Sequence, residues 1–262
     1  MSMPYYVSPE QVMKDRADYA RKGIARGRSL VGLSYAGGIA LVAENHSRTL
    51  RKVSEIYDRI AFAGVGKYNE FDQLRIAGVR AADMRGYSYS REDVDARSLA
   101  NSYAQMLGQV FTHEMKPLEV EILVAEVGHG DSSDDRLFHL LYDGTVVDEE
   151  NFTVLGGDAE LIGTRMKAAF VRDADLATAI AAASLAITGA DRTLTERELE
   201  VAVLERNVER RAFRRFEGSE LLALLSSVAT AAPVAAPVPA PVSPPPVADA
   251  RVVSDAPPFH EG

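Results

Sequence analysis

The sequence predicts an α+β protein in which stacked β-sheets are flanked by layers of helices. Three observations favour this class. Predicted strands and helices occur in separate blocks, as they do in folds whose sheets and helices form distinct layers. The strands around residues 30–43 are apolar on both faces, so their sheet is expected to be covered on both sides. The chain has 262 residues, 47% of them hydrophobic, which is enough for a sizeable core.

The first predicted element is a helix that begins after Ser8 and runs to about Lys22. Ser8 is a favourable N-cap, and Pro9 suits the first helical position because its ring presets the backbone. Glu10 adds negative charge at the positive end of the helix dipole. We expect the helix to end near Gly23.

Strands are predicted directly after this helix. The stretch GRSLVGLSYAGGIALVAE contains a strand, a turn at AGG and a second strand. Strand alternation places Val31, Leu33 and Tyr35 on one face of the first of these strands. Two shorter strands are expected at Val53–Tyr57 and at residues 60–64.

Two helices are predicted next. Asn69 and Asp72 resemble a helix cap and its third-position acid, which predicts a helix from there to about Arg85. Ser90 and Asp93 repeat the pattern ahead of a second helix, whose apolar residues form a single stripe. The members of this stripe are Leu99, Tyr103, Met106, Leu107 and Val110.

The second half of the chain continues in blocks. KPLEVEILVAEVG alternates as a strand, and RLFHLLYDGTVVDEENFTVLGG contains further strands around a turn at Asp143 and Gly144. Helices are predicted at residues 158–171 and 175–187. Strands in ELEVAVLE and AFRRF follow, and EGSELLALLSSV closes the globular part as a helix.

The composition changes abruptly at about Ala229. Nine of the twelve prolines lie beyond this point, in a segment with few large apolar side chains. Such a segment cannot bury enough apolar surface to fold, so residues 229–262 are expected to form an extended, disordered tail. One alternative function for the chain is a binding module that uses this tail.

Charge and residue content exclude several classes of function. A net charge of −9 argues against a nucleic-acid-binding surface, which normally needs a basic excess. The chain has no cysteine, which excludes disulfides, zinc–thiolate sites and cysteine nucleophiles. The first residues lack the order of a signal peptide, and no apolar stretch is long enough to span a membrane. We therefore expect a soluble, cytoplasmic protein that binds neither nucleic acid nor a membrane.

Short motifs do not provide a catalytic or metal site. GVGKYNEFDQL nearly matches a dinucleotide-binding fingerprint, but Asn69 replaces the third glycine and a second helix follows instead of a parallel strand. The histidines have no partner at the i, i+4 spacing of a helix-borne metal site, and no G-x-S-x-G elbow is present. We expect no catalytic residue, no metal and no cofactor.

Two charged segments are interpreted as surface structure. GHGDSSDDR clusters acids but lacks the spacing of a calcium loop, which favours a solvated hairpin loop. NVERRAFRRF is locally basic, and its four arginines between Arg210 and Arg215 are expected to be solvated or to face another subunit.

Several longer segments resemble proteasome core-particle α-subunits of the bacterial, actinobacterial type. The similarity is carried by SPEQVMKDRADYARKGIARGRSLVGLSYAGGIALVAE, by LRKVSEIYDRIAFAGVGKYNEFDQLRIAGVRAADMRGYSY, and by KPLEVEILVAEVG and YDGTVVDEENFTVLGG. It spans about residues 3–225. The resemblance implies a four-layer αββα sandwich over residues 8–228, the fold of the N-terminal nucleophile hydrolases.

The resemblance also implies that this chain is not catalytic. In the family's catalytic β-subunits a threonine is the first residue of the mature chain, and its own α-amine acts as the general base. Here the matching strand begins near Ser29, no threonine lies there, and a helix precedes it. The alternative is an active amidohydrolase or protease of the same fold, with Ser29 as the nucleophile after a cut behind Arg28.

By resemblance, seven copies form each outer ring of the particle, stacked on rings of β-subunits that enclose the protease chamber. Residues 1–7 are expected to form a gate over the axial pore. The gate residues, with the start of the helix, are Tyr5, Tyr6, Val7, Ser8 and Pro9. The substrates are unfolded proteins, often tagged with a ubiquitin-like modifier and delivered by a hexameric AAA ATPase. The Tyr-Asp-Arg element of archaeal and eukaryotic relatives is missing, so their gate mechanics need not transfer.

Two more sites follow from the resemblance. In the family, the C-terminal tail of the ATPase docks between adjacent α-subunits, and a lysine binds its terminal carboxylate. Lys52 in RTLRKVSEIYD lies where that lysine is expected, and an ammonium on a flexible stem suits a single carboxylate. The alternative is an ordinary surface lysine near Glu55. Lys116, Pro117 and Leu118 match the loop that lines the entrance annulus.

Overall fold

The structure is a computed structural model that describes residues 8–130 and 134–231. The expected gate residues Tyr5, Tyr6 and Val7 lie outside these ranges, as does the expected tail from residue 232 onward. Within the described ranges, helices and strands follow the predicted block order.

The first sheet contains, within the described residues, five antiparallel strands in the order β10-β9-β2-β1-β8. They are β1 (Leu30–Tyr35), β2 (Gly38–Glu44), β8 (Phe152–Leu155), β9 (Leu199–Glu205) and β10 (Phe213–Phe216). β1 and β2 pair across the predicted turn, and β9 joins the free edge of β2. The opening strand pair is therefore at the centre of its sheet.

The second sheet, again counted over the described part of the chain, has five strands in sequence order. They are β3 (Val53–Tyr57), β4 (Ile60–Gly66), β5 (Val120–Glu126), β6 (Arg136–Leu140) and β7 (Val146–Glu149). The next strand, β8, leaves this order and pairs with β1 of the first sheet. The sequence pattern predicts strands here, but only the pairing shows which sheet each strand joins.

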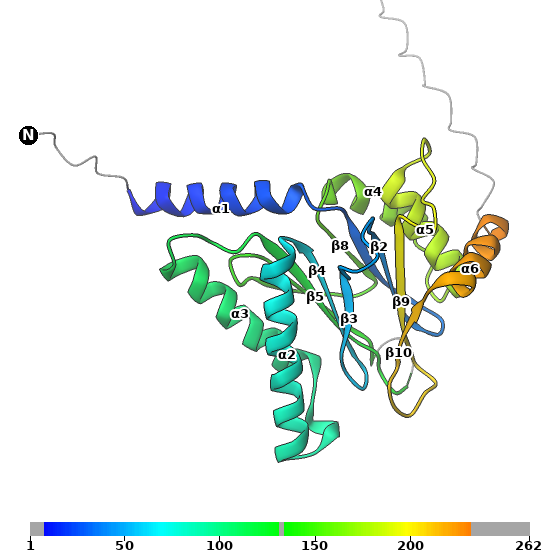
Figure 1. The fold of residues 1–262 in the computed structure, drawn as a ribbon, viewed down its shortest axis with the longest axis horizontal. Helices are drawn as coiled ribbons and strands as arrows, with labels where there is room; N and C mark the ends of the chain where they lie inside the picture. The colour runs from blue at the N-terminus through cyan, green and yellow to red at the C-terminus, as the bar shows by residue number, and fades with distance from the viewer. Residues whose placement is uncertain (1–7, 131–133, 232–262) are drawn as a thin grey trace, which may run out of the picture. The chain divides into compact units, whose positions relative to one another are not determined.

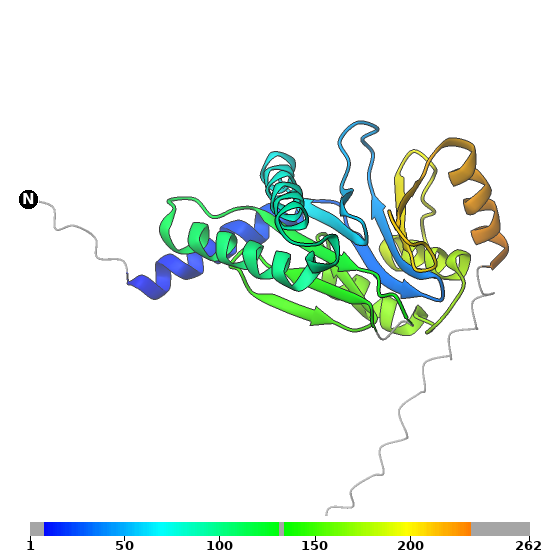
Figure 2. The ribbon, with the colours of Figure 1, turned by 90° about the horizontal axis from the view of Figure 1, so that it is seen from below.

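Helices cover the outer face of each sheet (Figures 1 and 2). α2 (Tyr68–Ser88) and α3 (Ala96–His113) pack on the second sheet. α4 (Ala159–Ala169), α5 (Leu176–Thr188) and α6 (Gly218–Ala231) lie on the first. The expected α+β class and its four-layer αββα sandwich are therefore confirmed.

Alternating side chains of β1 fill two different apolar layers. Val31, Leu33 and Tyr35 share one face, as predicted, and that face packs against the helix layer, whereas Leu30 points between the sheets. Gly32 lies in the middle of β1, and the side chain of Leu123 from the opposite sheet occupies the space that a Cβ atom there would need. The missing side chain at this position therefore lets the two sheets approach each other.

α1 (Pro9–Ala25) joins the sandwich only through its last turns. Ala20 and Ile24 are buried, while the first turns extend beyond the sheets (Figure 1). Ser8 caps the helix as predicted, because its hydroxyl oxygen accepts the Gln11 N–H at 3.3 Å.

α1 ends at Ala25, two residues beyond the predicted end near Gly23. The side chain of Glu119 fills the space that a Cβ atom at Gly23 would need. Glycine at this position serves close packing against the segment before β5, and it does not terminate the helix.

The predicted cap of α2 is wrong. The helix begins one residue before Asn69, and Lys67 at the N-cap position makes no side-chain cap bond. Asp72 forms an ion pair with Arg75 at 2.8 Å instead. Gly66 explains the early start, since its φ of 106° turns the chain sharply at the end of β4.

The capping box of Ser90 and Asp93 forms as predicted, but it opens only the short 3₁₀ helix Arg91–Asp93. The long helix α3 has a cap of its own, in which the Asp95 carboxylate accepts the Ser98 N–H at 2.8 Å. Two caps close together in the sequence therefore serve two different elements.

One residue in each of the two charged segments is less solvated than predicted. Asp135, the last acid of GHGDSSDDR, is 8% exposed and forms an ion pair with Arg206 at 2.8 Å; residues 131–133 of this segment lie outside the described ranges. Arg215 donates a hydrogen bond to the backbone carbonyl of Val53. The hairpins themselves form as predicted, and Arg210, Arg211 and Arg214 are exposed. The prediction is wrong for Asp135 and Arg215, because their partners lie far away in the sequence.

Candidate functional site

The segment between α1 and β1 contains the serine that an active hydrolase would use. Ser29 is 6% exposed, and its carbonyl oxygen accepts the Glu44 N–H at 3.0 Å. Gly157, with a φ of 58°, lies so close that a Cβ atom there would overlap the Ser29 hydroxyl. Ser29 is thus buried, and α1 precedes it in the fold.

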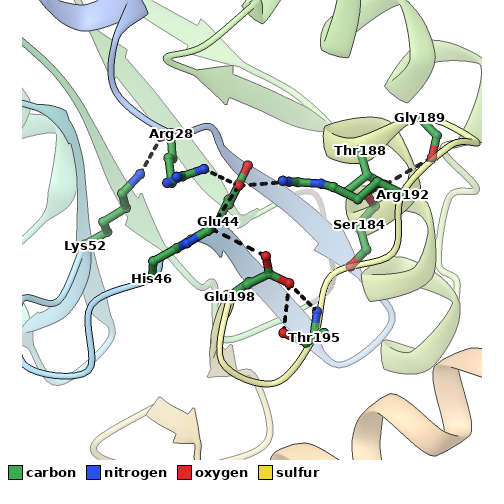
Figure 3. Close-up of polar contacts among 10 residues, drawn as sticks. All are labelled: Arg28, Glu44, His46, Lys52, Ser184, Thr188, Gly189, Arg192, Thr195 and Glu198. Atoms are coloured by element: carbon green, nitrogen blue, oxygen red, sulfur yellow. Dashed lines mark hydrogen bonds and ion pairs between the residues drawn. The ribbon is translucent and has the colours of Figure 1, made fainter.

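Glu44, at the end of β2, is the centre of a group of charged side chains (Figure 3). Its Oε1 atom lies 2.6 Å from Arg28 Nη1 and 2.8 Å from Arg192 Nη2. His46 Nε2 lies 3.3 Å from the same oxygen and 3.7 Å from Glu198 Oε1. The group therefore links the start of β1, the end of β2 and the loop after α5.

The loop after α5 is built to present Arg192. At the end of the helix, the Thr188 hydroxyl donates to the Ser184 carbonyl at 2.9 Å, and Gly189 turns the chain with a φ of 72°. Farther along, the Glu198 carboxylate closes the loop by accepting hydrogen bonds from the N–H and the hydroxyl of Thr195, at 3.1 and 2.8 Å. These local bonds direct the arginine toward Glu44 (Figure 3).

The environment of Glu44 favours its ionised form. Burial by itself raises the pKa of Glu44, but hydrogen bonds from Arg192 and His46 and the charge of Arg28 outweigh it. Its pKa therefore lies below the usual value. An ionised carboxylate with several cationic partners holds the surrounding chain segments together, and it is poorly suited to accept a proton at neutral pH.

Lys52, immediately before β3, reaches the same segment (Figure 3). Its ammonium donates a hydrogen bond to the backbone carbonyl of Arg28. Burial lowers the pKa of Lys52 to about 8, an effect that Glu200 and Glu44 oppose and Arg28 reinforces. Lys52 is therefore mostly protonated at neutral pH, yet it loses its charge within a mildly alkaline range.

A family model described as proteasome subunit matches residues 24–204, from the end of α1 through nearly all of β9. The chain belongs to the proteasome subunit family. Among relatives in this family, the proteasome subunit alpha of Acidimicrobium ferrooxidans is 63% identical over 221 residues, covering 84% of this chain and 95% of the relative. The corresponding protein of Sanguibacter keddieii is 59% identical over 234 residues, covering 87% and 91%. That of Xylanimonas cellulosilytica is 57% identical over 232 residues, covering 84% and 95%.

These relatives are proteasome α-subunits of actinobacteria, so the resemblance expected from the sequence is confirmed. The described residues contain no group of three histidine, cysteine or acidic side chains that could hold a metal ion. In the same ranges, every helix is too short or too polar to cross a membrane.

The segment before β5, which resemblance to proteasome subunits assigns to the entrance annulus, is held by two glutamates. Lys116 Nζ lies 2.8 Å from Glu70 Oε1 and 2.9 Å from Glu119 Oε1. Burial lowers the pKa of Lys116, but the hydrogen bonds to Glu119 and Glu70 outweigh it and raise the pKa. The ammonium also lies 5.7 Å from the ring centroid of Tyr19 in α1.

The expected site residues of this proteasome subunit lie in different parts of the fold. Ser8 and Pro9 form the outer end of α1. Pro117 is buried and Leu118 packs against the core beneath α2 and α3. Lys52 contacts the chain just after α1. Lys116 thus lies near Tyr19 of α1, and Lys52 contacts Arg28 just beyond the end of that helix.

The sequence reasoning missed the acids that organise this proteasome site. Glu44 lies in a strand that is otherwise apolar, GIALVAE, and Glu200 lies between Leu199 and the apolar run VAVL of β9. A buried acid needs hydrogen-bonding partners, so this pattern is a usable signal. Arg192 has no such signal, because it lies in a polar loop whose course depends on the tertiary structure.

Proposed function

We propose that the chain is a non-catalytic α-subunit of a bacterial proteasome core particle. Seven copies form each outer ring, and two such rings cap the β-subunit rings that carry threonine-type endopeptidase activity. The non-catalytic role is supported by the packing of α1 ahead of Arg28 and Ser29: Ala20 and Ile24 of this helix are buried against Tyr142, so the helix is part of the fold. A nucleophile that uses its own α-amine must be the first residue of its chain, and Ser29 is not.

The alternative function, an active hydrolase of the same fold, requires a cut between Arg28 and Ser29. The intact mass of the purified protein separates the two functions. A chain that starts at Met1 or Ser2 supports the α-subunit role. A chain that starts at Ser29, or threonine-type peptide hydrolysis without β-subunits, refutes it.

Assembly into a ring is supported by the exposed apolar side chains around α1. Val12, Met13 and Tyr19 on the helix are exposed, and so is Met115 just after α3. Large apolar side chains that one chain leaves in water mark a contact surface. We place a neighbouring copy of the chain on this part of α1.

A second exposed apolar group supports contact with another subunit of the particle. Met84, Tyr87 and Tyr89 lie at the end of α2 and just beyond it, and Tyr87 is 91% exposed. The C-terminal end of α2 lies far from α1 (Figure 1). This group therefore offers a contact separate from the one at α1.

Docking of a hexameric AAA ATPase is assigned to Lys52. Lys52 is partly exposed, and its ammonium donates to one backbone carbonyl, which leaves donor capacity for a terminal carboxylate. Binding of an anion also stabilises the charged form of a lysine whose pKa has been lowered by burial. The proposed ligand is the C-terminal tail of the ATPase.

The remaining assignments follow from membership of such a particle. Residues 1–7, with Ser8 and Pro9 at the start of α1, gate the passage of substrates, and Lys116, Pro117 and Leu118 line the entrance. The substrates are unfolded proteins marked with a ubiquitin-like modifier, and the particle works in the cytoplasm without a cofactor. The net charge of −9 is in line with the absence of a nucleic-acid partner.

The docking role is tested with Lys52→Ala in particles assembled with β-subunits. We expect stimulation of protein degradation by the ATPase to fall, while basal hydrolysis of a short peptide stays unchanged. Lys167→Ala is the control, because Lys167 is exposed on α4. Full stimulation of the Lys52→Ala particle would refute the docking assignment.

A further inference from the structure

Glu200, the second residue of β9, places a carboxylate inside the protein. It is 3% exposed, and most of the neighbouring residues of its strand are apolar. An ionised carboxylate in such a position is stable only when hydrogen-bond donors satisfy its oxygen atoms. The partners of Glu200 therefore show what this acid is for.

Three donors from one short segment bind the Glu200 carboxylate. Asn45 Nδ2 lies 2.7 Å and the backbone nitrogen of Lys52 3.0 Å from Oε2, and the backbone nitrogen of Val53 lies 3.2 Å from Oε1. β9 belongs to the first sheet and β3 to the second. One side chain of the first sheet thus fixes the residue at which the second sheet begins.

Asn45 extends this anchor into the loop that precedes Lys52. Its side-chain amide also donates to the Leu50 carbonyl at 2.8 Å, and its side-chain oxygen accepts the Ser47 N–H at 2.9 Å. Its backbone N–H donates to the Glu198 carbonyl at 2.7 Å. The loop therefore rests on Asn45 and Glu200, and Lys52 leaves it at a defined point.

We infer that Glu200 is a positioning residue for Lys52: it holds the backbone from which the ammonium projects, and it keeps a negative charge nearby so that Lys52 can bind a terminal carboxylate. The inference rests on the proposed docking function of Lys52. It adds to that function a residue on another strand and another sheet.

The charges around Lys52 come from several elements. Glu200 on β9 and Glu44 on β2 favour the ammonium form, and Arg28 before β1 opposes it. Arg215 on β10 lies against Glu200, with Nη2 3.6 Å from Oε1. His46 and Arg192 act on Glu44, as described above, and reach Lys52 only through that carboxylate.

Removal of the Glu200 charge should therefore change the pKa of Lys52. Burial already lowers the pKa of Lys52 to about 8, and Glu200 is the largest influence that opposes it. Without this carboxylate, the pKa of Lys52 falls further and more of the lysine is neutral at pH 7.5. A neutral amine cannot form an ion pair with a carboxylate.

The test uses full-length chain assembled with β-subunits. Acetylation of Lys52 by acetic anhydride, read by mass spectrometry over a pH series, reports the neutral amine directly. The midpoint of wild type is expected near pH 8, and Glu200→Gln should move it to lower pH. Glu205→Gln, on the same strand but partly exposed, is the matched control and should keep the wild-type midpoint.

A second measurement follows carboxylate binding. The probe is a fluorescein-labelled synthetic peptide that copies the C-terminal residues of the ATPase, compared with the same peptide as a C-terminal amide. At pH 7.5, Glu200→Gln should reduce the preference for the free carboxylate by roughly three- to tenfold. At pH 6.5 most of this preference should return, which a loop that has merely lost its structure would not show.

Two further variants distinguish the effect of charge from that of geometry. They also keep the inference testable if Glu200→Gln does not fold. Glu200→Asp keeps the charge but is too short for all three donors, and Asn45→Ala removes one anchor. Both should keep a midpoint close to that of wild type and bind the free carboxylate more weakly.

The inference is overturned if every Glu200 and Asn45 variant that folds keeps both the wild-type midpoint and the wild-type carboxylate preference. If Lys52→Ala keeps that preference, the docking function fails instead. The acetylation midpoint still reports the effect of Glu200 in that case.

Discussion

The ammonium group of Lys52 donates a hydrogen bond to the backbone carbonyl of Arg28. This carbonyl belongs to the peptide bond between Arg28 and Ser29, whose cleavage would free an α-amine on Ser29. The lysine therefore contacts the peptide bond that an active hydrolase would need to have cut. The same lysine remains partly exposed, so it can also bind an acceptor from another molecule.

Carboxylate binding at Lys52 should depend on pH. The ammonium is present below the pKa of about 8 and is lost as the pH rises through it. We expect the affinity for the ATPase-tail peptide to fall about tenfold for each pH unit above this pKa. Fluorescence anisotropy between about pH 6.5 and 9.5 measures the effect. Lys52→Arg keeps its charge over this range, so a slope that persists in this variant would show that another group titrates.

Deletion of residues 1–7 should speed passage into the particle. The cap of α1 remains, because the Ser8 hydroxyl and the Gln11 N–H are both retained. Basal hydrolysis of a fluorogenic peptide by the assembled particle is the measurement, and we expect it to rise severalfold. Deletion of residues 232–262 is the control for loss of a chain end. Equal rates for the 1–7 deletion and wild type would contradict the gate assignment.

Loss of the charge on Asp135 should destabilise the sandwich strongly. Its carboxylate receives two hydrogen bonds from Arg206, both at 2.8 Å, and one from the Gly128 N–H at 3.0 Å. Asp135→Asn removes the negative charge of this buried ion pair, which is expected to cost about 3–5 kcal/mol of unfolding free energy. Urea denaturation measures the loss. Asp134→Asn, exposed and adjacent, should stay within about 0.5 kcal/mol of wild type.

Gly78 of α2 and Tyr103 of α3 should show energetic coupling. A Cβ atom at Gly78 would overlap the Tyr103 hydroxyl, which is buried and makes no hydrogen bond within the described residues. Tyr103→Phe should therefore be neutral or stabilising by up to about 1 kcal/mol. Gly78→Ala should cost about 1–3 kcal/mol, and less when combined with Tyr103→Phe.

A double-mutant cycle of unfolding free energies measures this coupling. The packing of α2 on α3 would need another explanation if the two effects were simply additive.

The sequence by itself determined the layers of this protein. Apolar alternation along segments such as LVGLSY and VEILVA reports burial on each face of a strand, and the separate blocks of strands and helices predict separate layers. Local chemistry also predicted the Ser8 cap, because a helix cap needs only residues within one turn of each other. These features depend on neighbours in the chain, so they can be read directly from the sequence.

Only the tertiary structure decided which distant residues meet. Asp135 and Arg206 are 71 residues apart in the sequence, and Asn45 and Glu200 are 155 residues apart. β8 joins the first sheet without a signal in the sequence. Burial removes water from a charged or polar group, so its partner is whatever donor or acceptor the packed strands bring within about 3 Å. That choice depends on how strands pair across the two sheets, which no local pattern of residues contains.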